Sequence, residues 1–189
     1  MSKIISFICF FMLICSTIYA DNNVVINNIL NRKSVRKYTA QKVEQDKIDT
    51  IIKAGMSAPS AMNKQPWEFI VISDKKKLED IAKILPYASP AKNASVAIIV
   101  CGNVDVSESY WVQDCSAVTE NILLAAESLG LGAVWCGIYP QDERVKGIQR
   151  LLIIPKNIIP LSVVPIGYPL GNEMPKQKYN PSKIHNNKW

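Results

Sequence analysis

Cations and a hydroxyl group crowd together in one short segment near the start of the chain. Residues 31–40 read Asn-Arg-Lys-Ser-Val-Arg-Lys-Tyr-Thr-Ala and directly follow an apolar periodic stretch. An arginine guanidinium offers a planar fork that matches a phosphate monoester, and a lysine or a serine adds a point charge or a short donor. The segment therefore indicates a phosphate site, although a solvated basic turn is an open alternative on these residues alone. The candidate phosphate ligands are Arg32, Lys33, Ser34 and Arg36.

Four motifs in a fixed order carry a resemblance to a known family. The first is Arg32-x-Ser34-x-Arg36-x-Tyr38, and the second is Ala58-Pro59-Ser60-x-x-Asn63-x-Gln65-Pro66-Trp67. The third is residues 129–138, Leu-Gly-Leu-Gly-Ala-Val-Trp-Cys-Gly-Ile, and the fourth is Ile166-Gly167-Tyr168-Pro169 with Lys176, Lys178 and the closing residues 185–189. Together they resemble the nitroreductase family of flavin mononucleotide (FMN) enzymes over residues 28–189.

The resemblance implies both a fold and an activity. The fold is α+β, with a mixed, mainly antiparallel sheet flanked by helices, in an intertwined homodimer that holds two FMN sites at its interface. The activity is that of an oxidoreductase that uses NADH or NADPH to reduce nitroaromatic, quinone or related small-molecule acceptors in a ping-pong mechanism. No catalytic side chain is expected, because the hydride chemistry belongs to the flavin. Similar proteins with other flavin chemistry, reductive dehalogenation or flavin breakdown, are an alternative that these residues do not exclude.

The resemblance also implies a role for each matching position. The phosphate would be held by Arg32, Lys33, Ser34 and Arg36, with help from Lys176 and Lys178, where the family often has an arginine. The ring and the ribityl chain would meet Pro59, Ser60, Asn63 and Gln65, on a loop that reaches across the dimer. Trp135, Gly137 and Ile138 lie on the flavin-facing strand, where Gly137 and Ile138 would present backbone N–H groups to flavin N5 and its neighbouring carbonyl.

The first twenty residues have the outline of a secretory signal peptide. Lys3 opens them, an apolar run extends from Ile4 to Ile18, and the small residue Ala20 precedes the polar Asp21. We therefore expect a leader over residues 1–20 and one globular domain over residues 21–189, exported to the periplasm or cell envelope without stable membrane association. An uncleaved membrane anchor and a cytoplasmic protein are the alternatives. Export conflicts with the implied activity, because NADH and NADPH are scarce outside the cytoplasm.

Charge and cysteine usage limit the classes of partner and cofactor. The formal net charge of +6 raises nucleic acid as a partner, but no interleaving of aromatic and basic residues is present to read it. A non-enzymatic basic envelope protein that binds an anionic partner is the competing hypothesis, and it predicts no bound flavin. Cys101, Cys115 and Cys136 lack C-x-x-C spacing, and Cys101 and Cys115 are expected to pack in the core. Packing is also expected for Cys136, with a reactive thiol as the alternative because the resemblance puts it at the flavin face. With His185 as the only histidine, no metal site is expected.

Hydrophobic periodicity predicts the elements that must position these residues. We expect a packed helix around residues 25–30, with the cationic segment at its exit, and a second helix over residues 48–55 that Pro59 limits. Residues 67–73 and 95–101 are apolar enough for two buried, central strands. Further helices are expected over residues 78–85, 110–129 and 143–152, and further strands over residues 133–138 and 161–166. This alternation favours an α+β or α/β domain.

Overall fold

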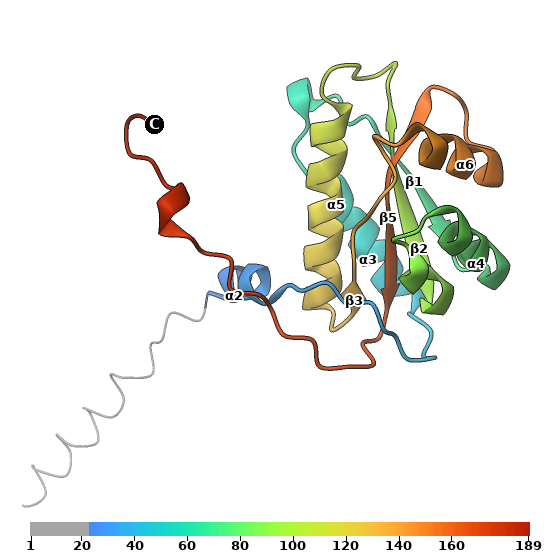
Figure 1. Cartoon of the computed structure of the whole chain (residues 1–189), viewed down its shortest axis with the longest axis horizontal. Helices are drawn as coiled ribbons and strands as arrows, with labels where there is room; N and C mark the ends of the chain where they lie inside the picture. Colours follow the sequence, from blue (N-terminus) through green and yellow to red (C-terminus); the bar gives the residue numbers. More distant parts are fainter. Residues whose placement is uncertain (1–22) are drawn as a thin grey trace, which may run out of the picture.

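An antiparallel sheet lies between two layers of helices in the computed structural model of the chain, which describes residues 23–189 (Figure 1). The helices are α2 (Val24–Asn31), α3 (Gln45–Met56), α4 (Lys75–Ile84), α5 (Trp111–Ser128) and α6 (Asp142–Leu152). The strands are β1 (Trp67–Ile72), β2 (Val96–Asn103), β3 (Gly132–Ala133), β4 (Cys136–Gly137) and β5 (Ile158–Gly167). Short 3-10 helices are η1 (Ala61–Asn63), η2 (Ser89–Asn93) and η3 (Pro181–Lys183).

Strand β2 shows why the sheet needs helices on both faces. Successive side chains of a strand point to opposite faces, and here both sets are apolar. Val96, Ile98 and Val100 pack with α3 and α5, in one core cluster. Ala97, Ile99 and Cys101 pack with α4 and α6, in a second cluster on the other face. A strand buried on both faces reads as an uninterrupted apolar run, as predicted for residues 95–101.

The sheet has the order β1-β2-β5-β3, and β4 also pairs with β5. All four ladders are antiparallel, which confirms the predicted α+β fold with a mainly antiparallel sheet. A parallel pairing is present as an isolated bridge between Ser34 and Ala133. That bridge joins the cationic segment to the edge of the sheet.

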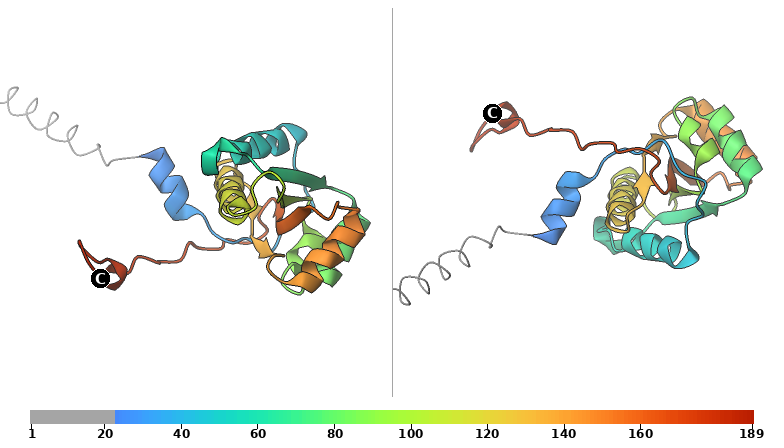
Figure 2. Two further views of the ribbon diagram at one scale, coloured as in Figure 1. Left: turned by 90° about the horizontal axis from the view of Figure 1, so that it is seen from above. Right: turned by 90° about the horizontal axis from the view of Figure 1, so that it is seen from below.

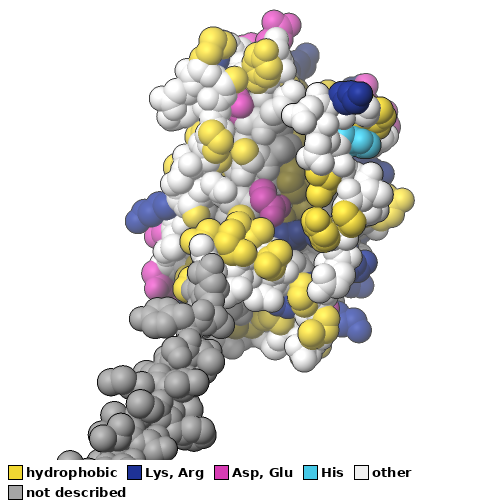
Figure 3. Space-filling view, turned by 90° about the vertical axis from the view of Figure 1, so that its left-hand side faces the viewer, with side chains coloured by type: hydrophobic (Ala, Val, Ile, Leu, Met, Phe, Trp, Pro, Cys, Tyr) yellow, Lys and Arg dark blue, Asp and Glu magenta, His cyan; other side chains and the backbone are white. Residues whose placement is uncertain are grey.

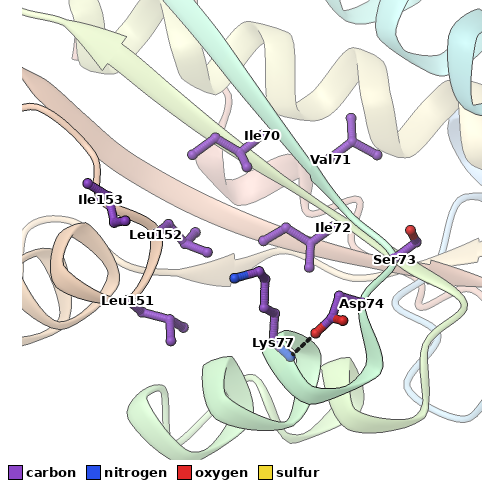
Figure 4. Close-up of a pocket in the computed structure, with 9 residues that line it drawn as sticks. All are labelled: Ile70, Val71, Ile72, Ser73, Asp74, Lys77, Leu151, Leu152 and Ile153. Atoms are coloured by element: carbon purple, nitrogen blue, oxygen red, sulfur yellow. Dashed lines mark hydrogen bonds between the residues drawn. The ribbon is translucent and has the colours of Figure 1, made fainter.

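Strand β1 lies at the edge of the sheet, so the expectation of two central strands is right for β2 and wrong for β1. Among the described strands β1 pairs with β2, and its Val71 is 41% exposed. Ile70 and Ile72 line an open hollow of about 310 Å³ between β1, the start of α4 and the end of α6 (Figure 4). The Lys77 side chain reaches into this hollow toward residues 151–153. An edge strand covered by helices on its faces reads in the sequence like a central strand.

The strand predicted over residues 133–138 is interrupted and appears as β3 and β4. Both pieces keep the same register along β5, with Ala133 opposite Ile166 and Cys136 opposite Val163. The gap lies opposite Pro165, which has no backbone N–H to donate to a neighbouring strand. The missing donor accounts for the interruption.

The helices agree with the predicted ones because their ends carry local signals. Asp74 caps α4 by accepting a hydrogen bond from the backbone N–H of Lys77 at 2.8 Å, and Pro86 follows its exit. Gly130 follows α5 with a φ of 72°, a left-handed conformation that glycine adopts without strain. No helix within residues 23–189 combines the length and the apolar content needed to cross a membrane.

Helix α2 and the C-terminal tail extend from the same side of the domain (Figures 1 and 2). Helix α2 has no buried residues, so within a single chain it is not the packed element that the sequence predicted. Its contact with the domain includes Asn28, whose side-chain amide donates to the carbonyl of Leu124 at 3.0 Å. The predicted leader lies outside the described residues.

Candidate cofactor-binding site

Six of the residues predicted to bind a cofactor line one cavity of about 450 Å³. They are Arg32, Lys33, Ser34, Arg36, Lys176 and Lys178, and Glu173 and Met174 complete the lining. The first four follow α2, and the lysines come from the tail that returns past β5. The fold therefore joins two cationic segments that are far apart in the sequence. By contrast, the hollow of Figure 4 contains none of the predicted site residues.

Two buried side chains fix the cationic segment against the sheet. The backbone N–H of Val35 donates to the carbonyl of Ala133 at 2.9 Å, and the Val35 side chain is fully buried. The Tyr38 hydroxyl lies 2.7 Å from the carbonyl oxygen of Val35 and 3.1 Å from that of Pro165. Burial raises the pKa of Tyr38 well above its usual range, so the hydroxyl remains a donor. The segment is therefore anchored by its own core residues rather than by α2.

Gly132 allows the segment to approach the sheet this closely. A Cβ atom built at this position would lie 2.5 Å from Cγ1 of Val35, much closer than a normal contact. The absence of a side chain at Gly132 thus sets the position of the phosphate candidates beside β3.

The cations of the cavity fall into two groups. Arg32 Nε lies 3.1 Å from Glu120 Oε1, and Lys33 Nζ lies 2.7 Å from Glu127 Oε1, so α5 holds both side chains in place. The remaining three, Arg36, Lys176 and Lys178, form no ion pair within residues 23–189. These unpaired cations outnumber the single carboxylate that lines the cavity, Glu173. The arrangement suits an anion with several oxygen atoms.

The exposed face of the interrupted strand carries the next group of predicted residues. Trp135 and Gly137 are exposed, whereas Ile138 is fully buried. A Cβ atom at Gly137 would meet nothing in the chain closer than the carbonyl oxygen of Tyr139, at 4.0 Å. The packing of the chain itself therefore does not require this glycine, which fits a place where a flat ligand approaches the backbone.

The backbone of Ile138 does not have the role expected of it. Its N–H donates to the carbonyl of Leu161 at 2.9 Å, so this amide serves the sheet and is not free for flavin N5. Tyr139 was missed by the sequence reasoning, although it continues the outward alternation of Trp135 and Gly137. Its ring is 40% exposed and packs edge-on against Trp111, with 4.9 Å between ring centroids.

Cys136 faces the core on this strand and has the character of a packing residue. It is 3% exposed, and burial raises the pKa of its thiol to about 11. A thiol with so high a pKa is neutral at physiological pH and a poor nucleophile. This agrees with the expectation that Cys136 packs in the core.

The loop that contains Pro59, Ser60, Asn63 and Gln65 has an unusual backbone. Met62, Asn63 and Gln65 have φ angles of 52°, 55° and 50°, in the left-handed region. Each such residue costs roughly 1–2 kcal/mol unless it is glycine, and asparagine tolerates it best. Strain of this kind persists where the surrounding structure imposes it, and it occurs frequently at functional sites.

Hydrogen bonds within the loop arrange its polar groups. The backbone N–H of Gln65 donates to Ser60 Oγ at 3.0 Å, and Gln65 Nε2 donates to Asn63 Oδ1 at 2.8 Å. The side-chain amide of Asn63 and the side-chain carbonyl of Gln65 remain available, and both residues are exposed. The loop thus presents one donor and one acceptor side by side to the solvent.

In one chain the loop and the segment after α2 that lines the cationic cavity lie toward opposite ends of α5 (Figure 1). The loop contacts Asp114 in the first turn, whereas the cavity cations pair with Glu120 and Glu127 in the second half. With a rise of about 1.5 Å per residue, Asp114 and Glu127 are separated by about 20 Å along the helix. The structure therefore does not bring the two groups of predicted residues together within a single chain.

Three further residues near the site escaped the sequence reasoning. Glu173 and Met174 line the cavity, and Asp114 anchors the loop. Glu173 and Met174 lie within the fourth motif, between Pro169 and Lys176, so their place in the tail is the signal that could have found them. Asp114 belongs to the amphipathic pattern of α5, and the sequence does not show whether an acidic residue in that helix is buried or exposed.

Fold and site together define a class of protein: a small α+β domain with a cationic cavity beside an interrupted strand of its sheet. Comparison with known proteins identifies the family. A sequence model of the Nitroreductase family matches residues 29–95 and 86–168. A relative from Methanothermobacter thermautotrophicus, provisionally named an NADH dehydrogenase/NAD(P)H nitroreductase, is 46% identical over 179 residues, which cover 92% of this chain and 94% of the relative. The chain belongs to the nitroreductase family of oxidoreductases.

Solved structures confirm the fold. A crystal structure from Parabacteroides distasonis with the same provisional name has a TM-score of 0.88 at 49% identity, and the match covers 89% of this chain and 100% of the other. A crystal structure from Desulfovibrio desulfuricans, provisionally named a nitroreductase and solved in complex with FMN, has a TM-score of 0.77 at 28% identity. That match covers 89% of this chain and 99% of the other.

Proposed function

We propose that the protein is an FMN-dependent oxidoreductase that uses NADH or NADPH to reduce nitroaromatic, quinone or related small-molecule acceptors by a ping-pong mechanism. The observation that carries the proposal is the cavity in which the segment after α2 meets the two tail lysines. A hydrogen bond to a charged group contributes about 1.5–3 kcal/mol, so several are needed to retain a cofactor without a covalent link. The cavity offers five cationic side chains for one phosphate.

The residues beside the cavity fit the rest of the cofactor. The bridge from Ser34 to Ala133 connects the cavity to the strand that leads to Gly137, where the chain leaves space for a ring. Trp135 and Tyr139 flank this glycine on the exposed face. Bound FMN would accept a hydride from NADH or NADPH and later deliver it to the acceptor, so one open face can serve both substrates in turn. The protein would anchor the phosphate, orient the ring and exclude water from its covered face.

A second copy of the chain would complete the site. The Asn63 loop lies at the far end of α5 from the cavity of its own chain, so we propose that it serves the cavity of a partner in a homodimer. The surface supports this arrangement. Large aliphatic side chains of α2 are exposed, with Val24 at 78% and Leu30 at 67%, and Figure 3 shows apolar side chains spread over this side of the molecule. Contiguous exposed apolar surface is typical of an interface.

The visible absorption spectrum of the purified protein tests the function. We expect a flavin band that bleaches on anaerobic addition of NADH or NADPH and returns when menadione is added. A colourless protein that takes up no added FMN would contradict the proposal and favour a basic protein that binds another anion. A flavin band that neither nucleotide bleaches would contradict the choice of donor and leave other flavin chemistry.

We further propose that residues 1–20 direct export to the periplasm or cell envelope, on the strength of the apolar run from Ile4 to Ile18. A fusion of residues 1–25 to a reporter that is active only in the periplasm should then be active. A silent reporter would contradict export and remove the conflict with a nucleotide donor.

A further inference from the structure

Asp114 is a buried carboxylate for which the proposed function has no use. It lies in the first turn of α5 and is 5% exposed. Its Oδ1 accepts a hydrogen bond from the backbone N–H of Ala61 at 2.9 Å, across 53 positions of sequence. Its Oδ2 is buried without a hydrogen-bond partner among residues 23–189. The carboxylate is thus directed at one backbone group of the strained loop.

The bond to Ala61 is placed where it can impose the loop conformation. Ala61 immediately precedes the left-handed residues Met62 and Asn63. The other loop bonds, between Ser60, Asn63 and Gln65, are internal and do not tie the loop to the domain. The two ends of the loop are already attached to the domain, by the bond from the Ala58 N–H to the Gly55 carbonyl and by the bond from the Asn103 N–H to the Pro66 carbonyl. The bond from Ala61 to Asp114 attaches the middle of the loop to α5 as well.

We infer that Asp114 is a positioning residue that holds the loop of residues 59–65 in the conformation that meets the flavin. This inference rests on the proposed function and adds a residue to it. Asp114 itself touches no reacting atom. It acts through the orientation of Asn63 and Gln65, whose free amide and carbonyl groups it keeps at a fixed place relative to α5.

Asp114 could hold the loop or could only stabilise α5, and the two roles predict different effects of its loss. A carboxylate in the first turn of a helix interacts favourably with the helix dipole, so Asp114 could serve only to stabilise α5. In that case its loss would lower the melting temperature and leave the loop unchanged. A buried carboxylate oxygen without a partner is itself destabilising, so we expect the reverse: little change in melting temperature and a loosened loop. Positioning residues commonly show such a conflict between stability and function.

The test compares Asp114→Ala with Asp114→Asn by amide hydrogen exchange in the flavin-free protein and by FMN titration. Asparagine keeps an oxygen that can accept from Ala61, and alanine does not. In D114A we expect exchange at the Ala61 amide to accelerate about tenfold or more, and trypsin to cleave faster after the exposed Lys64. We expect FMN to bind D114A about tenfold more weakly, which at about 1.4 kcal/mol corresponds to one hydrogen bond. D114N should resemble the unmodified protein in all three measurements.

Ser116→Ala is the matched control, because Ser116 lies on the same helix and its hydroxyl bonds within α5, to the carbonyl of Val112 at 2.6 Å. It should leave both the loop and FMN binding unchanged. The inference is wrong if D114A keeps the exchange rate and the FMN affinity of the unmodified protein, or if D114N fails to restore them. If D114A does not fold, hydrogen exchange in the unmodified protein still tests the bond from Ala61 to Asp114. The Ala61 amide should then exchange about tenfold more slowly than the Met62 amide, and equal exchange rates would contradict the inference. If the unmodified protein binds no FMN, the proposed function fails while the exchange result stands on its own.

Discussion

Arg32 is the cation on which the phosphate assignment depends most directly. It lines the cavity, forms an ion pair with Glu120, and has a side chain that is only 18% exposed. We expect Arg32→Ala to weaken FMN binding about 10- to 100-fold, because one charge-assisted hydrogen bond contributes about 1.5–3 kcal/mol. The melting temperature should change little, since the other partner, Glu120, is 45% exposed and regains water. Titration of the apoprotein with FMN, followed by fluorescence, measures the loss.

Two further variants test whether the loss of FMN affinity depends on the position of the cation or only on net charge. Arg150→Ala removes an exposed cation from α6, on the other face of the sheet, and should leave the affinity unchanged. Glu120→Gln removes the competing carboxylate and should leave FMN binding unchanged or tighten it. Equal weakening in R32A and R150A would show that net charge, rather than the cavity, determines affinity.

The buried thiols make stability depend on pH in the alkaline range. Burial raises the pKa of Cys136 to about 11, and that of Cys101 and Cys115 to about 12, from an ordinary value of 9.0. Well below pH 9 the thiols are neutral in both the folded and the unfolded state, and their contribution to stability is fully retained. As pH rises from about 9 toward 12 the unfolded chain ionises first, so the free energy of unfolding falls. Urea denaturation at pH 8, 9, 10 and 11 should show this decline.

Cys136→Ala isolates one of these contributions. This variant should lose some stability at every pH because it leaves a small cavity, but its decline between pH 9 and 11 should be shallower. Parallel curves for the variant and the unmodified protein would contradict the raised thiol pKa. Rapid labelling of native Cys136 at pH 8 would contradict it as well.

At the scale of elements, two glycines of the interrupted strand should respond in opposite ways. A Cβ atom at Gly132 would lie 2.5 Å from Val35, so Gly132→Ala should destabilise the protein by about 1–3 kcal/mol through overpacking and displace the cationic segment. A Cβ atom at Gly137 meets only an oxygen at 4.0 Å, so Gly137→Ala should keep its stability and lose FMN affinity. Urea denaturation and FMN titration of both variants measure the contrast. Full affinity in G137A would remove Gly137 from the site.

The elements could be predicted where the signal is local. Pro59, Pro86 and Gly130 mark where helices end, and the apolar period marks which face of α5 is buried. Whether a strand lies at the centre or the edge depends on its neighbours, so β1 was misplaced. The break between β3 and β4 arises opposite Pro165, on another strand, and cannot be read from residues 133–138.

Part of the candidate site could also be predicted, where the signal lies within a few neighbouring residues. Arg32 to Arg36 concentrate their charge in a few residues, so these residues alone point to either a phosphate site or a solvated basic turn, and the family resemblance favours the phosphate site. Only the family resemblance points to Lys176 and Lys178, because nothing in the sequence of the tail shows which surface the tail meets. The Ile138 amide was misassigned because its hydrogen bond to Leu161 depends on the pairing of the strands.

At the scale of the whole molecule, helix α2 and the C-terminal tail are two regions that one chain leaves largely uncovered. Helix α2 exposes an apolar face, and a cavity of about 530 Å³ lies between it, α3 and α5. In the tail, Met174 is 72% exposed and Tyr179 is 79% exposed. Extended arms with large exposed apolar side chains are stabilised when they pack on another subunit. The same two arms carry or border the cations of the cavity, so assembly and cofactor binding should be coupled.

A mixed dimer tests this coupling. If the cavity of one chain receives the Asn63 loop of its partner, then Arg32→Ala and Asn63→Ala damage opposite halves of one composite site. Differently tagged copies of the two variants, co-expressed and purified through both tags, would form dimers in which one site carries both substitutions and the other carries neither. We expect such dimers to bind FMN with full affinity at about half of their sites, whereas each parental dimer binds weakly at both. If one chain supplied the whole site, both sites of the mixed dimer would stay damaged and no affinity would return. A flavin-loaded protein that sediments as a monomer would exclude a shared site directly.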